Sequence, residues 1–82
     1  MMKKVLVTGA TGFLGKYVVE ELVEHGYQVR AFGRNSKVGR SLENSSVSFF
    51  QGDLTKADDV LEACKGMDLV VHAGALSTVW GP

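Results

Sequence analysis

Three glycines spaced three residues apart, Gly9, Gly12 and Gly15, are the feature of this sequence with the clearest chemical meaning. They follow an apolar run at residues 5–7, typical of a strand buried on both faces of a parallel sheet, and they precede a helical pattern. In this order the first glycine allows a tight turn, the second lets the backbone approach a diphosphate, and the third lets the helix pack closely on the strand. The helix start offers free N–H groups and about half a positive charge to phosphates. The sequence therefore predicts a dinucleotide site.

Residues 8–15, Thr-Gly-Ala-Thr-Gly-Phe-Leu-Gly, resemble the opening of the extended short-chain dehydrogenase/reductase family. That family includes NAD(P)-dependent epimerases, dehydratases and reductases. The resemblance implies that this segment holds the cofactor's diphosphate, and the residues concerned are Gly9, Thr11, Gly12, Phe13, Leu14 and Gly15. The alternative is a glycine-rich turn that binds no ligand.

The choice between NAD and NADP depends on the residue that follows the second predicted strand. An acidic residue about 20 positions past the glycines would bind the adenosine ribose hydroxyls and favour NAD. Here Arg34 stands 19 positions after Gly15, and no Asp or Glu lies between Tyr27 and Leu42. A guanidinium can hold a ribose 2′-phosphate through a charged fork, so NADP is preferred over NAD, with Lys37 as a second cation. A solvated loop cation is the alternative.

Two further segments match the same family's pattern. Asp53 and Leu54 resemble an Asp-Leu pair whose carboxylate meets the adenine amino group and whose backbone lines the ring; a turn or cap aspartate is the alternative. Ala73, Gly74 and Ala75 resemble a small-residue turn that admits the cofactor's ribose and phosphate. The family more often has alanine where Gly74 stands.

The family's chemistry uses a Tyr-x-x-x-Lys pair, in which the tyrosine exchanges a proton with the substrate and the lysine lowers the pKa of that tyrosine. Tyr17 is followed four positions later by Glu21, and Tyr27 by Ala31, so we assign no catalytic residue. His72 ends a predicted buried strand with no carboxylate partner in view, which favours a packed histidine bonded to backbone over an acid or base.

The resemblance implies that residues 1–82 are the N-terminal part of a dinucleotide-binding domain. The longer protein would be an oxidoreductase or epimerase that moves hydride between nicotinamide and a sugar nucleotide or a small hydroxy/keto compound, and this chain alone would be inactive. A module of the same fold that senses a nucleotide or binds a partner without catalysis is the alternative.

The elements that must position these residues alternate along the chain. Strands are expected at residues 5–7, 28–32, 47–51 and 67–73. Helices are expected from after Gly12 to about His25 and at residues 56–65, with a short one near residues 38–42. Such alternation gives a parallel sheet with right-handed crossovers, and the strand order 3-2-1-4 places the glycine loop where ligands bind. We expect an α/β fold, a doubly wound Rossmann-type sheet that is incomplete, with about four strands.

Polar residues near the predicted helix ends suggest how the helices begin and end. Thr11 is a predicted N-cap of the first helix, and Gly26 should follow its C-terminus. Thr55 is a predicted N-cap of the last helix. That helix is expected to bury its apolar residues, Val60, Leu61 and Cys64.

Composition bounds the remaining classes. Eighty-two residues fit one small domain, and a net charge of zero gives no electrostatic case for binding nucleic acid or an anionic membrane. The single cysteine, Cys64, excludes an internal disulfide and a cysteine-built metal site and fits a reducing compartment. The apolar start is interrupted too early for a signal peptide, and no apolar run approaches a membrane span of about 20 residues. We therefore expect a cytoplasmic protein without a metal.

The fourth predicted strand would lie at the edge of the sheet. Its residues are largely apolar, and an apolar strand edge without a neighbour invites association with another chain. We therefore expect a homo-oligomer formed through this edge.

Overall fold

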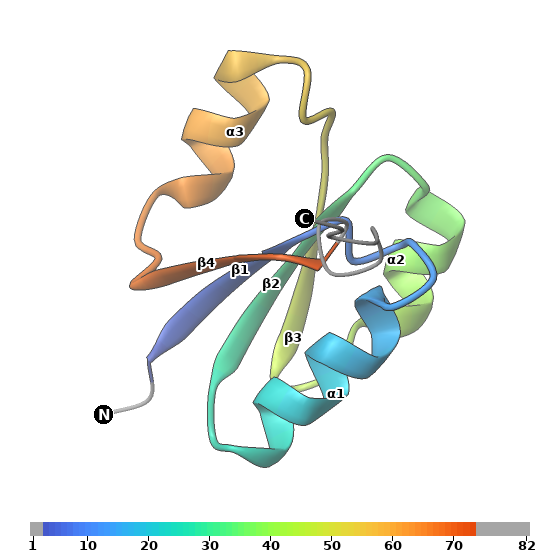
Figure 1. Cartoon of the computed structure of the whole chain (residues 1–82), viewed down its shortest axis with the longest axis vertical. Coiled ribbons are helices and arrows are strands. Elements are labelled where there is room, and N and C mark those ends of the chain that lie inside the picture. Colours follow the sequence, from blue (N-terminus) through green and yellow to red (C-terminus); the bar gives the residue numbers. More distant parts are fainter. Residues whose placement is uncertain (1–2, 74–82) are drawn as a thin grey trace, which may run out of the picture.

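The computed structural model describes residues 3–73, and within them strands and helices alternate as predicted (Figure 1). The elements are β1 (Lys4–Thr8), α1 (Gly15–Glu24), β2 (Gln28–Gly33), α2 (Ser36–Leu42), β3 (Val47–Gln51), α3 (Ala57–Cys64) and β4 (Leu69–His72). The strands form one parallel sheet in the order β3-β2-β1-β4. Helices α1 and α2 cover one face of this sheet and α3 the other (Figure 1). The predicted doubly wound α/β fold and the strand order 3-2-1-4 are confirmed.

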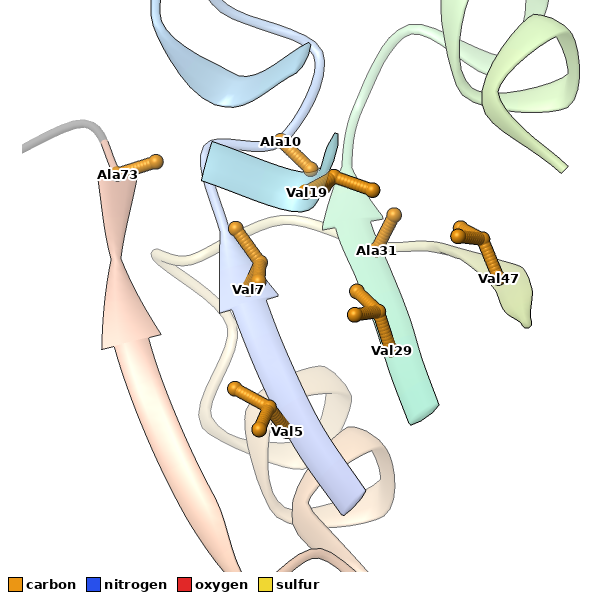
Figure 2. Packing of buried hydrophobic residues seen from close by; sticks show 8 residues of the cluster. All are labelled: Val5, Val7, Ala10, Val19, Val29, Ala31, Val47 and Ala73. Atoms are coloured by element: carbon orange, nitrogen blue, oxygen red, sulfur yellow. The ribbon is translucent and has the colours of Figure 1, made fainter. Parts of the chain in front are cut away.

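The two-residue period of the strands sends alternate side chains to two separate cores. On β1, Val5 and Val7 join the core beneath α1, whereas Leu6 joins the core beneath α3. Figure 2 shows the first core, which contains Val5, Val7, Ala10, Val19, Val29, Ala31, Val47 and Ala73. The second contains Leu6, Phe32 and Ala63. Strand β1 is therefore buried on both faces, as its unbroken apolar run predicts.

Helix α1 ends as predicted but begins later than predicted. Gly26 follows its last turn with φ of 87°, a conformation that favours glycine, and Val19 is buried on the face toward the sheet. The N-cap is Leu14, and it makes no side-chain capping bond. The prediction that Thr11 caps this helix is wrong, because turns continue through the glycine loop up to Leu14.

Helix α3 also corrects two expectations. Its N-cap is Lys56, and the Thr55 hydroxyl donates instead to Oδ1 of Asp53, so Thr55 is not the cap. Leu61 is 66% exposed, whereas Ala63 is fully buried in the second core. The helix thus packs through a narrower stripe than its apolar residues suggested.

None of the helices within residues 3–73 is long and apolar enough to cross a membrane.

Candidate functional site

A pocket of about 440 Å³ lies where the carboxyl ends of β1, β2 and β3 meet. Parallel strands bring these ends to one edge of the sheet, which is where doubly wound sheets bind ligands. The lining comes from the end of β2 and from the loops after the three strands: Gly9, Thr11, Gly12, Phe32, Gly33, Arg34, Asn35, Gly52, Asp53, Leu54 and Thr55. Six of the predicted site residues are therefore brought together here, namely Gly9, Thr11, Gly12, Arg34, Asp53 and Leu54.

The glycine loop is a pair of tight turns anchored to β2. Gly9 has φ of 70°, which a residue with a Cβ adopts only under strain. The Ala10 N–H donates to the Phe32 carbonyl at 3.1 Å, which ties the loop to the neighbouring strand. The Gly12 N–H donates to the Gly9 carbonyl at 3.0 Å, and the Gly15 N–H to the Gly12 carbonyl at 3.2 Å. The predicted tight turn at Gly9 is confirmed.

Three other amides of this loop make no backbone hydrogen bond within residues 3–73, those of Thr11, Phe13 and Leu14. Phe13 is 85% exposed, and Leu14 directly precedes the first residue of α1. The positive end of the α1 dipole lies at the same place. Among residues 3–73, this end of the helix therefore presents backbone donors and a partial positive charge of the kind that binds an anion.

Close contacts with neighbouring atoms leave little or no room for a side chain at three glycines of the loop and of the adjoining end of β2. A Cβ on Gly15 would overlap the backbone of Ala10, so the start of α1 lies against the loop itself rather than against a strand side chain. A Cβ on Gly12 would lie 3.2 Å from the Gly9 carbonyl oxygen. A Cβ on Gly33 would lie 2.5 Å from Oγ1 of Thr11. The loop and the end of β2 are therefore packed as one unit.

Asp53 is fixed by its own turn. The Thr55 N–H and hydroxyl donate to Oδ1 of Asp53 at 2.9 and 2.7 Å. These bonds, assisted by the positive charges of Arg34 and Lys56, hold the pKa of the Asp53 carboxyl below its ordinary value of 3.8. Asp53 is thus the turn aspartate that the sequence allowed as an alternative, and it still lines the pocket, so contact with an adenine ring stays a prediction.

Arg34 is exposed at the wall of the pocket that continues from β2. The side-chain amide of Gln51, at the end of β3, donates to the Arg34 carbonyl at 3.3 Å and links the two strand ends. Lys37 is exposed on α2 and is not part of the pocket lining. Among residues 3–73, Arg34 is therefore the cationic side chain that lines the pocket.

The end of β4 differs from what the sequence predicted for His72. His72 is exposed, and its Nδ1 shares a hydrogen bond of 2.7 Å with the buried Thr8 hydroxyl on β1. The expectation of a packed histidine bonded to backbone is wrong, because the parallel register places these two residues side by side. Ala73 is buried in the core of Figure 2. The predictions for Gly74 and Ala75 lie outside the described residues.

Sequence reasoning missed several residues that shape the pocket. Gly33 and Gly52 each lack a side chain where one would collide with a neighbour, and Asn35 lines the pocket while its side chain caps α2. A glycine directly after each of two predicted strands was the sequence signal that could have identified Gly33 and Gly52.

No group of three metal-ligating side chains occurs among residues 3–73.

Comparison with known proteins places the chain in a family. Residues 5–81 match the NAD dependent epimerase/dehydratase family. The 2-alkyl-3-oxoalkanoate reductase of Stenotrophomonas maltophilia is 44% identical over 78 residues, which are 95% of this chain and 23% of that protein. The decarboxylating sterol-4-alpha-carboxylate 3-dehydrogenase of Dictyostelium discoideum is 39% identical over 74 residues, which are 90% of this chain and 23% of that protein.

Solved structures share the fold. The 3-hydroxyacyl-CoA dehydrogenase type-2 of Mycobacterium avium matches with a TM-score of 0.78 and 25% identity, over 87% of this chain and 32% of that one. The chain thus spans under a quarter of the length of the two curated relatives. Because the family match covers nearly all of its residues, the chain belongs to the NAD dependent epimerase/dehydratase family.

Proposed function

We propose that the pocket binds the adenosine and diphosphate parts of a nicotinamide dinucleotide, with NADP preferred over NAD. The observation that carries this proposal is the convergence of three loops on one pocket. They supply an open glycine turn, a cation and an aspartate-leucine pair, represented by Gly12, Arg34, Asp53 and Leu54. The family's dependence on NAD supports a nicotinamide dinucleotide as the ligand.

The glycine loop fits a diphosphate. The amides of Phe13 and Leu14 make no backbone hydrogen bond within residues 3–73 and can donate to a phosphate. A side chain on Gly12 would crowd the Gly9 carbonyl and leave less room for a diphosphate to approach the loop backbone. We assign the diphosphate to these amides and to the start of α1, where the helix dipole adds to the attraction.

The adenosine part fits between the ends of β2 and β3. The exposed guanidinium of Arg34 can hold a ribose 2′-phosphate through two charged hydrogen bonds, and this is the basis of the preference for NADP. Leu54 is half exposed at the pocket and offers apolar surface to an adenine ring. Asp53 offers a carboxylate beside it.

The bound cofactor would supply hydride transfer, and this chain's own residues would bind and orient it. The sequence contains no Tyr-x-x-x-Lys pair, so we expect no turnover by the 82 residues alone. The two curated relatives are named for a 3-oxo acid and for a sterol carboxylate dehydrogenated at carbon 3. Their names favour a hydroxy/keto compound over a sugar nucleotide as the substrate of a longer protein.

Binding is tested by thermal unfolding of the purified chain with NADP⁺ or NAD⁺. A ligand at a hundred times its Kd stabilises the folded state by about 2.7 kcal/mol. We expect NADP⁺ to raise the unfolding temperature at lower concentration than NAD⁺. Protection by NAD⁺ alone would contradict the preference for NADP, and protection by neither would contradict the assignment of the pocket.

A further inference from the structure

Asp59, in the first turn of α3, reaches back to the loop that carries Asp53. Its Oδ2 accepts a hydrogen bond of 2.9 Å from the Asp53 N–H in a partly buried position. The Asp53 carbonyl in turn accepts a bond of 3.0 Å from the Lys56 N–H. The main chain of Asp53 is therefore held on one side by α3 and on the other by the N-cap of α3.

The surroundings leave this loop little room to adopt another conformation. A Cβ on Gly52 would lie 2.6 Å from the Phe32 ring and 3.3 Å from Cβ of Asp59. The Phe32 ring is itself buried and stacked on Phe50, with ring centroids 5.7 Å apart. The loop thus lies between the buried Phe32 ring and the first turn of α3. Asp59 supplies the hydrogen bond that fixes the position of the loop backbone.

We propose that Asp59 is a positioning residue for the adenosine end of the cofactor. Its carboxylate fixes the Asp53 main chain, and this keeps Asp53 and Leu54 at the wall of the pocket. Asp59 itself is not part of the pocket lining, so it acts through the loop and not by contact with the ligand. This inference rests on the proposed function, because it concerns the same pocket.

The chain offers a matched control beside Asp59. Asp58 carries the same charge in the same helical turn but is exposed, and among residues 3–73 it makes no side-chain hydrogen bond. Asp58→Ala therefore removes one charge without touching the loop. Asp59→Ala removes the acceptor of the Asp53 N–H, whereas Asp59→Asn keeps an oxygen acceptor of the same reach.

The experiment measures the Kd of adenosine 2′,5′-bisphosphate for the full chain by calorimetry, with each variant held where denaturation curves show it folded. We expect Asp59→Ala to weaken binding about tenfold, because a partly buried N–H is left without its partner. Asp59→Asn should bind within about threefold of the wild type, and Asp58→Ala should match it. In amide spectra, Asp59→Ala should shift the resonances of residues 52–55 and leave those of residues 9–15 unchanged.

The outcomes separate this inference from the proposed function. If the wild-type chain binds no adenosine bisphosphate, the assignment of the pocket to NADP fails and the role of Asp59 fails with it. If the wild type binds and Asp59→Ala binds equally well, or Asp58→Ala weakens binding as much, only the role of Asp59 is contradicted. If Asp59→Ala does not fold, two other measurements test the role of Asp59. Fast hydrogen exchange of the Asp53 amide in the wild type, or failure of Asp59→Asn to retain binding, would contradict that role.

Discussion

Arg34 and Asp53 bring opposite charges to two walls of one pocket. The hydrogen bonds from Thr55 and, to a smaller extent, the positive charge of Arg34 lower the pKa of the Asp53 carboxyl and keep that carboxylate ionised. Both groups are accessible to solvent, so their mutual attraction is screened and each can also interact with a ligand. The chemistry of the site therefore depends on where the loops hold these two groups.

Replacing Arg34 tests the preference for NADP. We expect Arg34→Ala to raise the Kd of NADP⁺ about tenfold, because a charged hydrogen bond to phosphate is lost, and to change the Kd of NAD⁺ by less than about twofold. The matched control is Arg40→Ala, since Arg40 is exposed on α2 and does not line the pocket. Equal losses for the two dinucleotides, measured by calorimetry, would contradict a phosphate-specific role.

The titration of Asp53 tests the geometry of its turn. Because the pKa in the folded chain lies below 3.8, the ionised carboxylate stabilises the fold above that pH, and this contribution is lost as the pH falls through the lowered pKa. Thr55→Val removes the hydroxyl donor, so we expect the Asp53 pKa to rise toward its ordinary value. Carbon-detected magnetic resonance of the carboxyl group measures both values. An unchanged pKa in the variant would show that the hydroxyl makes no such bond.

At the scale of elements, α1 has a glycine at each end, Gly15 at its first residue and Gly26 after its last turn. The two glycines are needed for different reasons. Gly15→Ala should destabilise the fold by about 2–3 kcal/mol and weaken dinucleotide binding, because the added Cβ meets the backbone of Ala10. Gly26→Ala should cost about 1–2 kcal/mol through its positive φ alone and leave binding unchanged, since nothing lies within 4 Å of the added Cβ. Denaturation curves and calorimetry on both variants decide this. Equal effects on binding would argue against a special role of Gly15.

The sequence predicts the elements well where the pattern is periodic. The apolar run of β1 and the stripe of α1 determine which faces are buried, and Gly26 marks the helix end through its backbone conformation alone. Helix starts are harder to predict, because competing partners decide them. Thr55 is a suitable cap by residue type, but in the fold its hydroxyl donates to Asp53.

The site is predictable in its backbone and less so in its contacts. Gly9, Gly12, Arg34 and Asp53 are found from local patterns, and the fold brings them to one pocket. The hydrogen bond between Thr8 and His72 joins residues 64 positions apart, so it depends on the register of two strands that local pattern does not reveal.

At the scale of the whole molecule, the pocket and the sheet edge that we expect to associate are separate. The pocket lies at the carboxyl ends of the strands, whereas β4 forms one lateral edge of the sheet within residues 3–73. Leu69 and Val70 on β4 are 45% and 44% exposed. An apolar strand at an edge is a template for pairing with another chain, so ligand binding and association need not interfere.

The expected homo-oligomer follows from this edge and can be tested by sedimentation. We expect the chain to associate at high concentration and Val70→Lys to make it monomeric, because a charge on an edge strand opposes pairing. Leu61→Lys is the control, since Leu61 is also exposed but lies on α3. A wild-type chain that sediments as a monomer at every concentration would contradict association through β4.

The measurement that tests the central claim most directly is a titration of the isotope-labelled chain with NADP⁺, followed through its amide resonances. The account predicts that the shifts concentrate at residues 9–15, 33–35 and 52–55, the three loops that meet at the pocket. Residues 28–29 and 45–48, at the opposite ends of the strands, should stay in place. An absence of shifts, or shifts that concentrate at those opposite ends, would contradict the account.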